Sequence, residues 1–283
     1  MTKINAYLDL TNIFTIAVKE IHDARRNRWF VFLAVVFVLV SSAMSWFGLA
    51  GAGIVGVAGF GRTAASLLNL IIFFVPLIGL TMGAISIAGE REQGTLLTLL
   101  SQPITTTELL LGKFLGTAVA LSSAILVGFG FSGLMIGWYV GTEQLGGFLS
   151  LLGWALLFGA GQLSVGFLIS VFAPNSARAL GIAIFIWLFT VFFSDLTLMS
   201  AFLLWRFPVQ TLFWLALINP AQVFKISSIY TLQGNLELIG EAGLYARDIL
   251  GDKTLTVLST ILVAWVLLPL SISLWLFGRR KGQ

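Results

Sequence analysis

The sequence predicts an all-α membrane protein with six transmembrane helices. Hydrophobic residues make up 58% of the 283 positions and charged residues only 10%, and the mean hydropathy is +0.99, which is far too apolar for a soluble domain. Six apolar runs also come close to, or exceed, the roughly 20 residues that a helix needs to cross the hydrocarbon core of a bilayer. These runs are 29–49, 67–89, 114–140, 148–172, 179–204 and 255–277.

The segment 1–28, ahead of the first run, is predicted to form a cytoplasmic amphipathic helix on the membrane surface. Its apolar residues recur at helical spacing: Leu10, Ile13, Phe14, Ala17 and Ile21. A basic cluster and a tryptophan, Arg25, Arg26, Arg28 and Trp29, follow and would anchor at the lipid headgroups. A signal peptide is the alternative, but this polar lead is too long for one, so we expect the first run to be retained.

The distribution of Lys and Arg predicts that both termini are cytoplasmic. Eleven of the 16 lie on the side of the termini: Lys3, Lys19, Arg25, Arg26, Arg28, Arg91, Lys113, Arg178, Arg279, Arg280 and Lys281. The other five are Arg62, Arg206, Lys225, Arg247 and Lys253. Positively charged loops tend to stay in the cytoplasm, so residues 29–283 form a six-helix domain with its even-numbered connections inside.

A charged and polar hairpin, residues 89–113, separates the second and third runs. Glu90, Arg91 and Glu92 end the second span, and Gly94 permits a sharp change of direction. A short leucine-rich helix over 95–100 follows. Thr105 and Glu108 then match the capping box that starts a new helix. These features predict a short cytoplasmic helix held between two spans, although an ordinary loop explains the same residues equally well.

The segment 205–254, between the last two runs, is predicted to be external. Residues 212–218 are apolar and would form a short helix, half inserted or lying on the surface, before a polar stretch over 233–253. A seventh span is the alternative. It would have to include Arg206 and Pro208, and a charge inside a span costs about 2.5–3.5 kcal/mol.

Several kinds of chemistry are excluded by composition. Cysteine is absent and His22 is the only histidine, so the chain offers no disulfide framework, no thiolate and no convincing metal or haem site. The net charge of +4 and the pI near 9.6 come from basic residues at the ends of apolar runs rather than along one polar face. We therefore expect no metal, no cofactor and no nucleic-acid partner.

Asp195 is the only acid within the fifth apolar run. An ionisable group inside a membrane suggests proton or cation coupling. Counted along the run from Ala179, however, Asp195 falls near the outer interface, where a solvated or helix-capping carboxylate is the alternative.

The hairpin string GEREQGTLLTLLSQPITTTELLLGKFLG resembles the cytoplasmic hairpin of ABC-2 type transport permeases. In that family an acidic and basic cluster is followed by GT, a leucine-rich helix, a polar step with proline and a GK pair. The resemblance extends over nearly the whole chain and implies an ABC-2 type, type V exporter-like permease fold in the inner membrane. Within the family the chain is most similar to the NosY subfamily, through residues 25–29, 61–70 and 219–226.

The resemblance further implies a homodimer mounted on two copies of a separate, NosF-like cytoplasmic ATPase. The residues expected to couple the two proteins are Glu90, Arg91, Glu92, Gly94, Thr95, Leu96, Leu97, Leu99, Leu100, Pro174, Asn175 and Arg178. No G-x-x-x-x-G-K-[ST] pattern occurs in the chain, so ATP and Mg are expected in the partner and this chain is not expected to be an enzyme.

The NosY likeness also implies copper-site maturation of nitrous oxide reductase and a NosD-like external partner, with Asn219, Pro220 and Phe224 as candidate contacts. Two alternatives stay open. The first is an ABC-2 exporter of a lipid or a small hydrophobic compound. The second is an ion-coupled carrier or an intramembrane enzyme, for which Asp195 is the one available group.

Overall fold

A computed structural model describes residues 9–50, 57–139, 145–203, 207–233, 245 and 248–280. Regular structure in these ranges is helical throughout, as predicted. The α-helices are α1 Leu10–Arg26, α2 Arg28–Ala50, α3 Val57–Glu92, α4 Thr95–Leu100, α5 Thr106–Tyr139, α6 Leu145–Phe172, α7 Ser176–Leu188, α8 Ser194–Leu203, α9 Val209–Ile218, α10 Pro220–Gln233 and α12 Thr254–Arg280. A π-helix, Phe189–Phe193, joins α7 to α8, and a 3₁₀ turn, Gly251–Lys253, precedes α12.

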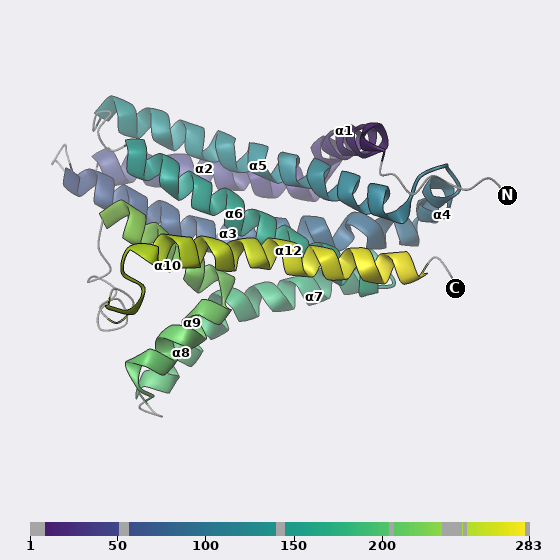
Figure 1. The fold of residues 1–283 in the computed structure, drawn as a ribbon. Helices are drawn as coiled ribbons and strands as arrows, with labels where there is room; N and C mark the ends of the chain where they lie inside the picture. The colour runs from purple at the N-terminus through teal and green to yellow at the C-terminus, as the bar shows by residue number, and fades with distance from the viewer. Residues whose placement is uncertain are drawn as a thin grey trace.

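Within the described ranges, six helical segments are long and apolar enough to cross a membrane, which confirms the predicted number. They are α2, α3, α5, α6, the α7–π–α8 segment and α12. In Figure 1, α1, α4 and the end of α12 lie at one end of the bundle, while α8 swings away from it with α9 alongside. An even number of spans brings the two ends of a chain to one side in this way; that this side is the cytoplasm remains our expectation.

Two spans are longer than their apolar runs predicted. Helix α3 begins at Val57 rather than at residue 67, and α5 begins at Thr106, where the capping box predicted a helix start, rather than at residue 114, where its apolar run begins. Hydropathy locates the part of a helix that crosses the hydrocarbon core, whereas caps and loops decide where the helix itself ends. Both helices therefore extend past their apolar runs.

Helices α3 and α6 form the centre of the bundle. A Cβ added to Gly83 would lie 2.5 Å from the carbonyl oxygen of Leu163, so the two backbones approach as closely as only glycine allows. Along the same two helices, Ile71, Phe158 and Phe167 are fully buried. The close packing makes α3 and α6 a firm base for the hairpin that follows α3.

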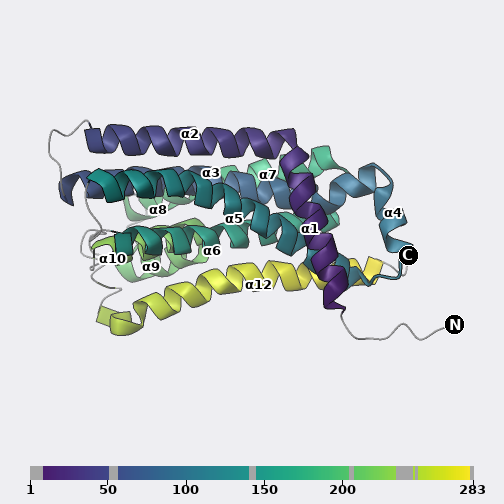
Figure 2. The ribbon, with the colours of Figure 1, turned by 90° about the horizontal axis from the view of Figure 1, so that it is seen from above.

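Helix α1 lies across the direction of the spans at one end of the bundle (Figure 2). A Cβ on Gly116 of α5 would collide with the carbonyl oxygen of Ala17, so α1 lies directly on the α5 backbone. The predicted amphipathic helix is present, but some of its apolar side chains pack against the bundle while others point away from it. Ile13 is buried toward α5, whereas Leu10 and Phe14 are exposed, as expected for a helix resting on lipid.

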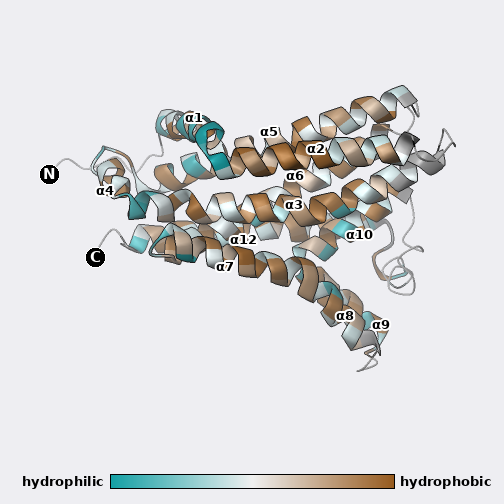
Figure 3. Ribbon diagram, turned by 180° about the vertical axis from the view of Figure 1, so that it is seen from behind, coloured by the Kyte–Doolittle hydropathy of each residue, from teal (hydrophilic) through white to brown (hydrophobic). Residues whose placement is uncertain are grey.

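The distribution of polarity fits this placement. Figure 3 shows apolar residues along the spans and the most hydrophilic helical residues gathered near α1 and α4. Large apolar side chains on the outside of the bundle, such as Phe131 and Leu134 of α5, are exposed in the single chain. A surface of this kind suits lipid or another transmembrane helix.

Helices α9 and α10 meet at a sharp bend of 109°, a geometry typical of a broken span or a re-entrant segment. The sequence predicted the apolar helix, which begins at Val209, but not α10, which packs against α6 and α12. In Figure 1, α10 returns along these helices toward the end of the bundle opposite α4. Most of the predicted polar stretch, residues 234–244 and 246–247, and Arg206 lie outside the described residues.

Candidate functional site

The hairpin between α3 and α5 has the predicted shape. Gly94 adopts a left-handed conformation with φ of 74°, which reverses the chain between α3 and α4. Within α4, Leu96 is buried, and Leu99 and Leu100 pack partly against the core. Leu97 is 76% exposed. Helix α4 is thus fixed on one side and presents an apolar side chain on the other.

The predicted capping box at the start of α5 is confirmed. The Thr105 N–H donates to Glu108 Oε2 at 2.9 Å, and the Glu108 N–H donates to Thr105 Oγ1 at 3.1 Å. Glu108 Oε1 also accepts from the Asp9 N–H at 2.8 Å, while the Asp9 side chain caps α1. One carboxylate therefore ties the start of α1 to the start of α5, a link that the sequence did not indicate.

Arg91 and Glu92 bind the hairpin to the next loop at the same end of the bundle. The Arg91 guanidinium donates to the carbonyl oxygens of Ser170 at 3.4 Å, Val171 at 3.3 Å and Ala173, at the end of α6. These carbonyls lack helical partners and carry the negative end of the helix dipole. Glu92 Oε2 accepts from the Ser176 N–H at 3.0 Å, at the start of α7. Residues far apart in the chain thus hold the end of α3 against the α6–α7 loop.

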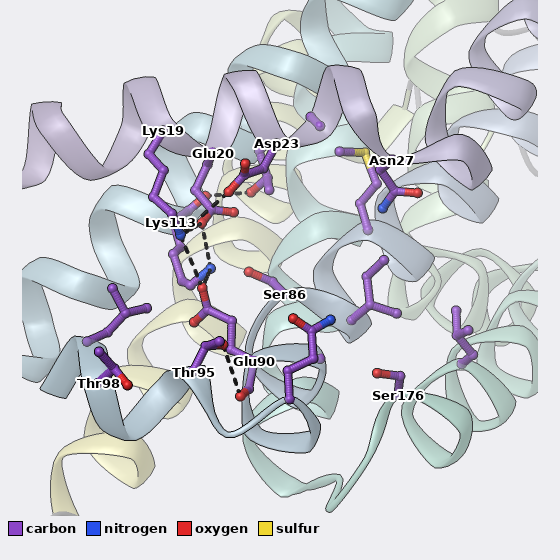
Figure 4. A pocket seen from close by; sticks show the side chains of 18 residues that line it. Lys19, Glu20, Asp23, Asn27, Ser86, Glu90, Thr95, Thr98, Lys113 and Ser176 are labelled. Carbon is purple, nitrogen blue, oxygen red and sulfur yellow. Dashed lines mark hydrogen bonds and ion pairs between the residues drawn. The ribbon is translucent and has the colours of Figure 1, made fainter.

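Glu90 turns inward to a buried lysine. Lys113 is 2% exposed, and its Nζ lies 2.6 Å from Glu20 Oε1 and 3.0 Å from Glu90 Oε1 (Figure 4). A buried ammonium is costly unless it is paired, so these contacts fix α1, α3 and α5 to one another. We call Lys19, Glu20, Asp23, Glu90 and Lys113 the charge cluster.

Lys19 lies at the exposed edge of this cluster, with its Nζ 3.5 Å from Glu90 Oε1 and 3.5 Å from Asp23 Oδ2. Burial alone would lower the pKa of Lys19, but the nearby carboxylates of Glu90, Glu20 and Asp23 outweigh this effect and hold the pKa above its ordinary value. The contribution of the Lys19 ion pairs to the stability of the folded protein is therefore complete at neutral pH. It is lost only as the pH rises through the alkaline pKa of Lys19 in the folded state.

The second predicted contact segment lies beside the hairpin. Asn175 caps α7 by accepting from the Arg178 N–H at 3.0 Å. Pro174 and Arg178 are exposed. Because Glu92 is bonded to Ser176, the two segments predicted from sequence, 89–100 and 174–178, form one connected surface. Among the residues predicted to couple to the ATPase, the exposed ones are Glu92, Gly94, Thr95, Leu97, Pro174 and Arg178.

Of the three residues predicted to contact an external partner, Pro220 and Phe224 are buried within the chain and Asn219 is half-buried. Phe224 is fully buried and stacks on Phe158 with ring centroids 5.1 Å apart, and Pro220 is buried. The Asn219 side chain donates to the Thr190 carbonyl in the π-helix at 2.9 Å and accepts from the Ala221 N–H at 2.8 Å. A π-helix leaves carbonyls to be satisfied from elsewhere, and Asn219 supplies a donor here. The structure thus gives these residues a packing role.

Asp195 also has partners within the chain. Gln222 Nε2 donates to its Oδ1, and Lys225 Nζ lies 3.8 Å from its Oδ2. The Asp195 side chain remains about half exposed. In this arrangement the carboxylate connects α8 to α10.

Comparison with known proteins identifies the family. A family model described as ABC-2 family transporter protein matches residues 14–281. The chain belongs to the ABC-2 transporter family. Two relatives, each named "Probable ABC transporter permease protein NosY", come from Pseudomonas aeruginosa and Stutzerimonas stutzeri. The first is 38% identical over 223 residues, covering 77% of this chain and 81% of the relative. The second is 32% identical over 281 residues, covering 96% and 99%.

This NosY-like ABC-2 permease is a multi-pass membrane protein, of the inner membrane in bacteria, as its six apolar helices also indicate. Sequence reasoning missed the charge cluster behind its hairpin. A local signal was present, since Glu20 falls at helical spacing among Ala17, Ile21 and Ala24, where an acid is out of place on an apolar face. No such signal shows which lysine would pair with it.

Proposed function

We propose that this ABC-2 permease subunit couples ATP hydrolysis by a separate cytoplasmic ATPase to export or mechanical transmission across the membrane. The observation that carries the proposal is the position of Leu97. It is 76% exposed on a short helix at the end of the bundle, outside the apolar part of the spans. An apolar side chain displayed on a polar end is typical of a docking residue that fills a pocket in a partner.

The surroundings of α4 suit the transmission of movement. Gly94 and the capping box connect α4 to α3 and α5 by short links. Arg91 and Glu92 connect the same hairpin to α6 and α7, and Glu90 connects it to α1 through Lys113. A displacement of α4 would thus pass to α3 and α5, and through the end of α3 to α1, α6 and α7, rather than being absorbed by a loose loop.

The partners follow from this proposal. We expect a NosF-like ATPase on the surface formed by residues 89–100 and 174–178, and a second copy of the permease to complete the transporter. ATP and Mg would be bound by the ATPase, so the permease itself would hold no cofactor and perform no hydrolysis.

The specific role we propose is copper-site maturation of nitrous oxide reductase, together with a NosD-like protein on the external side. The support is similarity to two NosY proteins, one of them along 96% of this chain. Tagged permease purified from native membranes distinguishes this role from a general one. An ATPase together with an external partner protein supports the NosY-type role, whereas an ATPase alone supports an exporter of a lipid or small hydrophobic compound.

Substitution at α4 tests the coupling itself. Leu97→Asp should reduce co-purification of the ATPase about tenfold or more, because a charge would replace the apolar anchor of the contact. Leu97→Met is the matched control and should retain the ATPase, since it keeps an apolar side chain of similar size. Both variants should reach the membrane normally because Leu97 packs on little of the chain. Equal recovery of the ATPase with Leu97→Asp and Leu97→Met would refute this role for α4.

A further inference from the structure

A cavity of about 770 Å³ lies behind the hairpin, between α1, α3, α4, α5 and α7 (Figure 4). The charge cluster forms part of its wall, together with neutral polar side chains that include Asn27, Ser86, Gln93 and Ser176. Apolar side chains, including Met82, Ile85 and Leu180, also line it. The cavity is therefore amphipathic, with a charged part and an apolar part.

Two polar atoms of this wall are buried without a hydrogen-bond partner, Ser86 Oγ and Glu90 Oε2. Ser86 as a whole is 9% exposed. Lys19 and Lys113 both approach Glu90 through Oε1, which leaves Oε2 without a donor. A buried carboxylate oxygen left in this state is costly, so the site requires a donor from outside the chain.

The charges of the cluster indicate the kind of donor. Two lysines face three carboxylates along the wall, which leaves one net negative charge. An added phosphate or carboxylate would meet the unpaired Glu90 oxygen and be repelled, whereas a cation would be attracted. The described residues contain no group of three or more His, Cys, Asp or Glu that could hold a metal ion. The apolar wall further favours a cation that carries a carbon chain.

We propose that this cavity binds a primary ammonium group, carried either on the headgroup of an aminophospholipid or on a free amine. Its N–H groups would satisfy the two unpartnered atoms of this wall, Glu90 Oε2 and Ser86 Oγ, and the Asp23 carboxylate supplies a further negative charge on the same wall. The amphipathic helix α1 borders the cavity and exposes Leu10 and Phe14 on its outer side. A headgroup at the membrane surface would thus reach the polar wall. The proposal does not depend on the ATPase contact.

The test uses the full-length permease, purified with its associated subunits, and a thermal-unfolding assay. The probes are short-chain phosphatidylethanolamine, short-chain phosphatidylcholine and free ethanolamine. We expect stabilisation by at least one of the two primary amines and none by phosphatidylcholine, whose quaternary ammonium has no N–H to donate. Stabilisation by phosphatidylethanolamine alone identifies the lipid as the source, and stabilisation by ethanolamine as well shows that the ammonium group is sufficient. Ethanolamine alone would identify a free amine.

Two variants and a control tie the effect to this wall. Ser86→Ala and Asp23→Asn should each weaken binding of the primary amine about tenfold, the first by removing a hydrogen bond and the second by removing a negative charge from the wall. Ser228→Ala is the matched control, because Ser228 on α10 is the other serine in the described residues with a buried, unpartnered hydroxyl. It should leave binding unchanged. The proposal is overturned if no primary amine binds, if phosphatidylcholine binds equally well, or if both variants bind as the unmodified protein does.

Discussion

At the scale of single residues, Lys113 is the most consequential charge in the chain. It lies at the start of a transmembrane helix, almost fully buried, and two carboxylates from different helices neutralise it. Removing one member of a buried ion pair leaves the others as uncompensated charges, which costs far more than losing an exposed pair. The cluster therefore fixes how α1, α3 and α5 meet beneath the hairpin.

Replacing the lysines separately measures this difference. Lys113→Met should lower the free energy of unfolding by about 3–5 kcal/mol, because Glu20 and Glu90 remain buried without a cation. Lys19→Met removes the same charge from a half-exposed position and should cost about 1 kcal/mol or less. Thermal unfolding of both purified variants in one detergent provides the comparison. A similar loss of unfolding free energy in the two variants would show that the burial of Lys113 does not make its ion pairs more important than those of Lys19.

The sequence revealed local residue pairs but not distant ones. Thr105 and Glu108 are three positions apart, so the capping box was predictable and is present. Lys113 and Glu20 are 93 positions apart, and nothing in either neighbourhood specifies the other. Charge reversal at Glu90 would be a natural test if that residue faced an ATPase. In the structure it would instead break the cluster, and Leu97 is the informative position.

At the scale of helices, α1 approaches the α5 backbone closely at two glycines of α5, Gly112 and Gly116. Any side chain on Gly116 would meet the backbone of α1 at Ala17. Gly130, also on α5, has nothing within 4 Å of an added Cβ. Substitutions at Gly116 and Gly130 can therefore be compared. Both remove the general cost of glycine in a helix, but only the one at Gly116 disturbs the close contact with α1.

Alanine at these two positions should have opposite effects. Gly116→Ala should push α1 from α5, lowering the free energy of unfolding by about 1–3 kcal/mol and exposing α1 to proteases. Gly130→Ala should stabilise the protein by about 0.5–1 kcal/mol, since alanine favours a helix more than glycine does. Thermal unfolding and limited proteolysis report both results. Equal protease resistance of α1 in the two variants would contradict the close contact.

Helices were predictable where periodicity or apolar length marked them, as for α1, α4 and the spans. Helix α10 was not, because it falls in the segment 205–254, which was predicted to be external, and it carries several polar residues. In the structure several of them, including Ser227 and Ser228, are buried against other helices. The π-helix was hidden for a related reason: Asn219 stabilises it from 29 positions away through the Thr190 carbonyl. Tertiary contacts of this kind leave no local pattern.

At the scale of the whole molecule, composition and apolar length alone determined the fold class, and the hairpin pointed to the family. The bilayer imposes this simplicity, since a spanning segment must be an apolar helix of sufficient length. Packing between spans is less predictable, because lipid-facing and protein-facing residues are equally apolar. The resulting molecule has its hairpin, α1 and the end of α12 at one end, and the α9–α10 bend away from them (Figure 1).

The central claim is that α4 lies on the cytoplasmic side of the membrane and binds the ATPase. The chain has no cysteine, so single cysteines can be introduced without altering any other position. Thr98, exposed on α4, and Asp248, exposed shortly before α12, are suitable positions near opposite ends of the bundle.

The decisive measurement is labelling of Thr98→Cys and Asp248→Cys with a membrane-impermeant maleimide. We predict that Asp248→Cys reacts in intact cells, whereas Thr98→Cys reacts only in inside-out vesicles and is protected there when the ATPase is bound. Labelling of Thr98→Cys from outside intact cells, or equal labelling with and without the ATPase, would contradict the account.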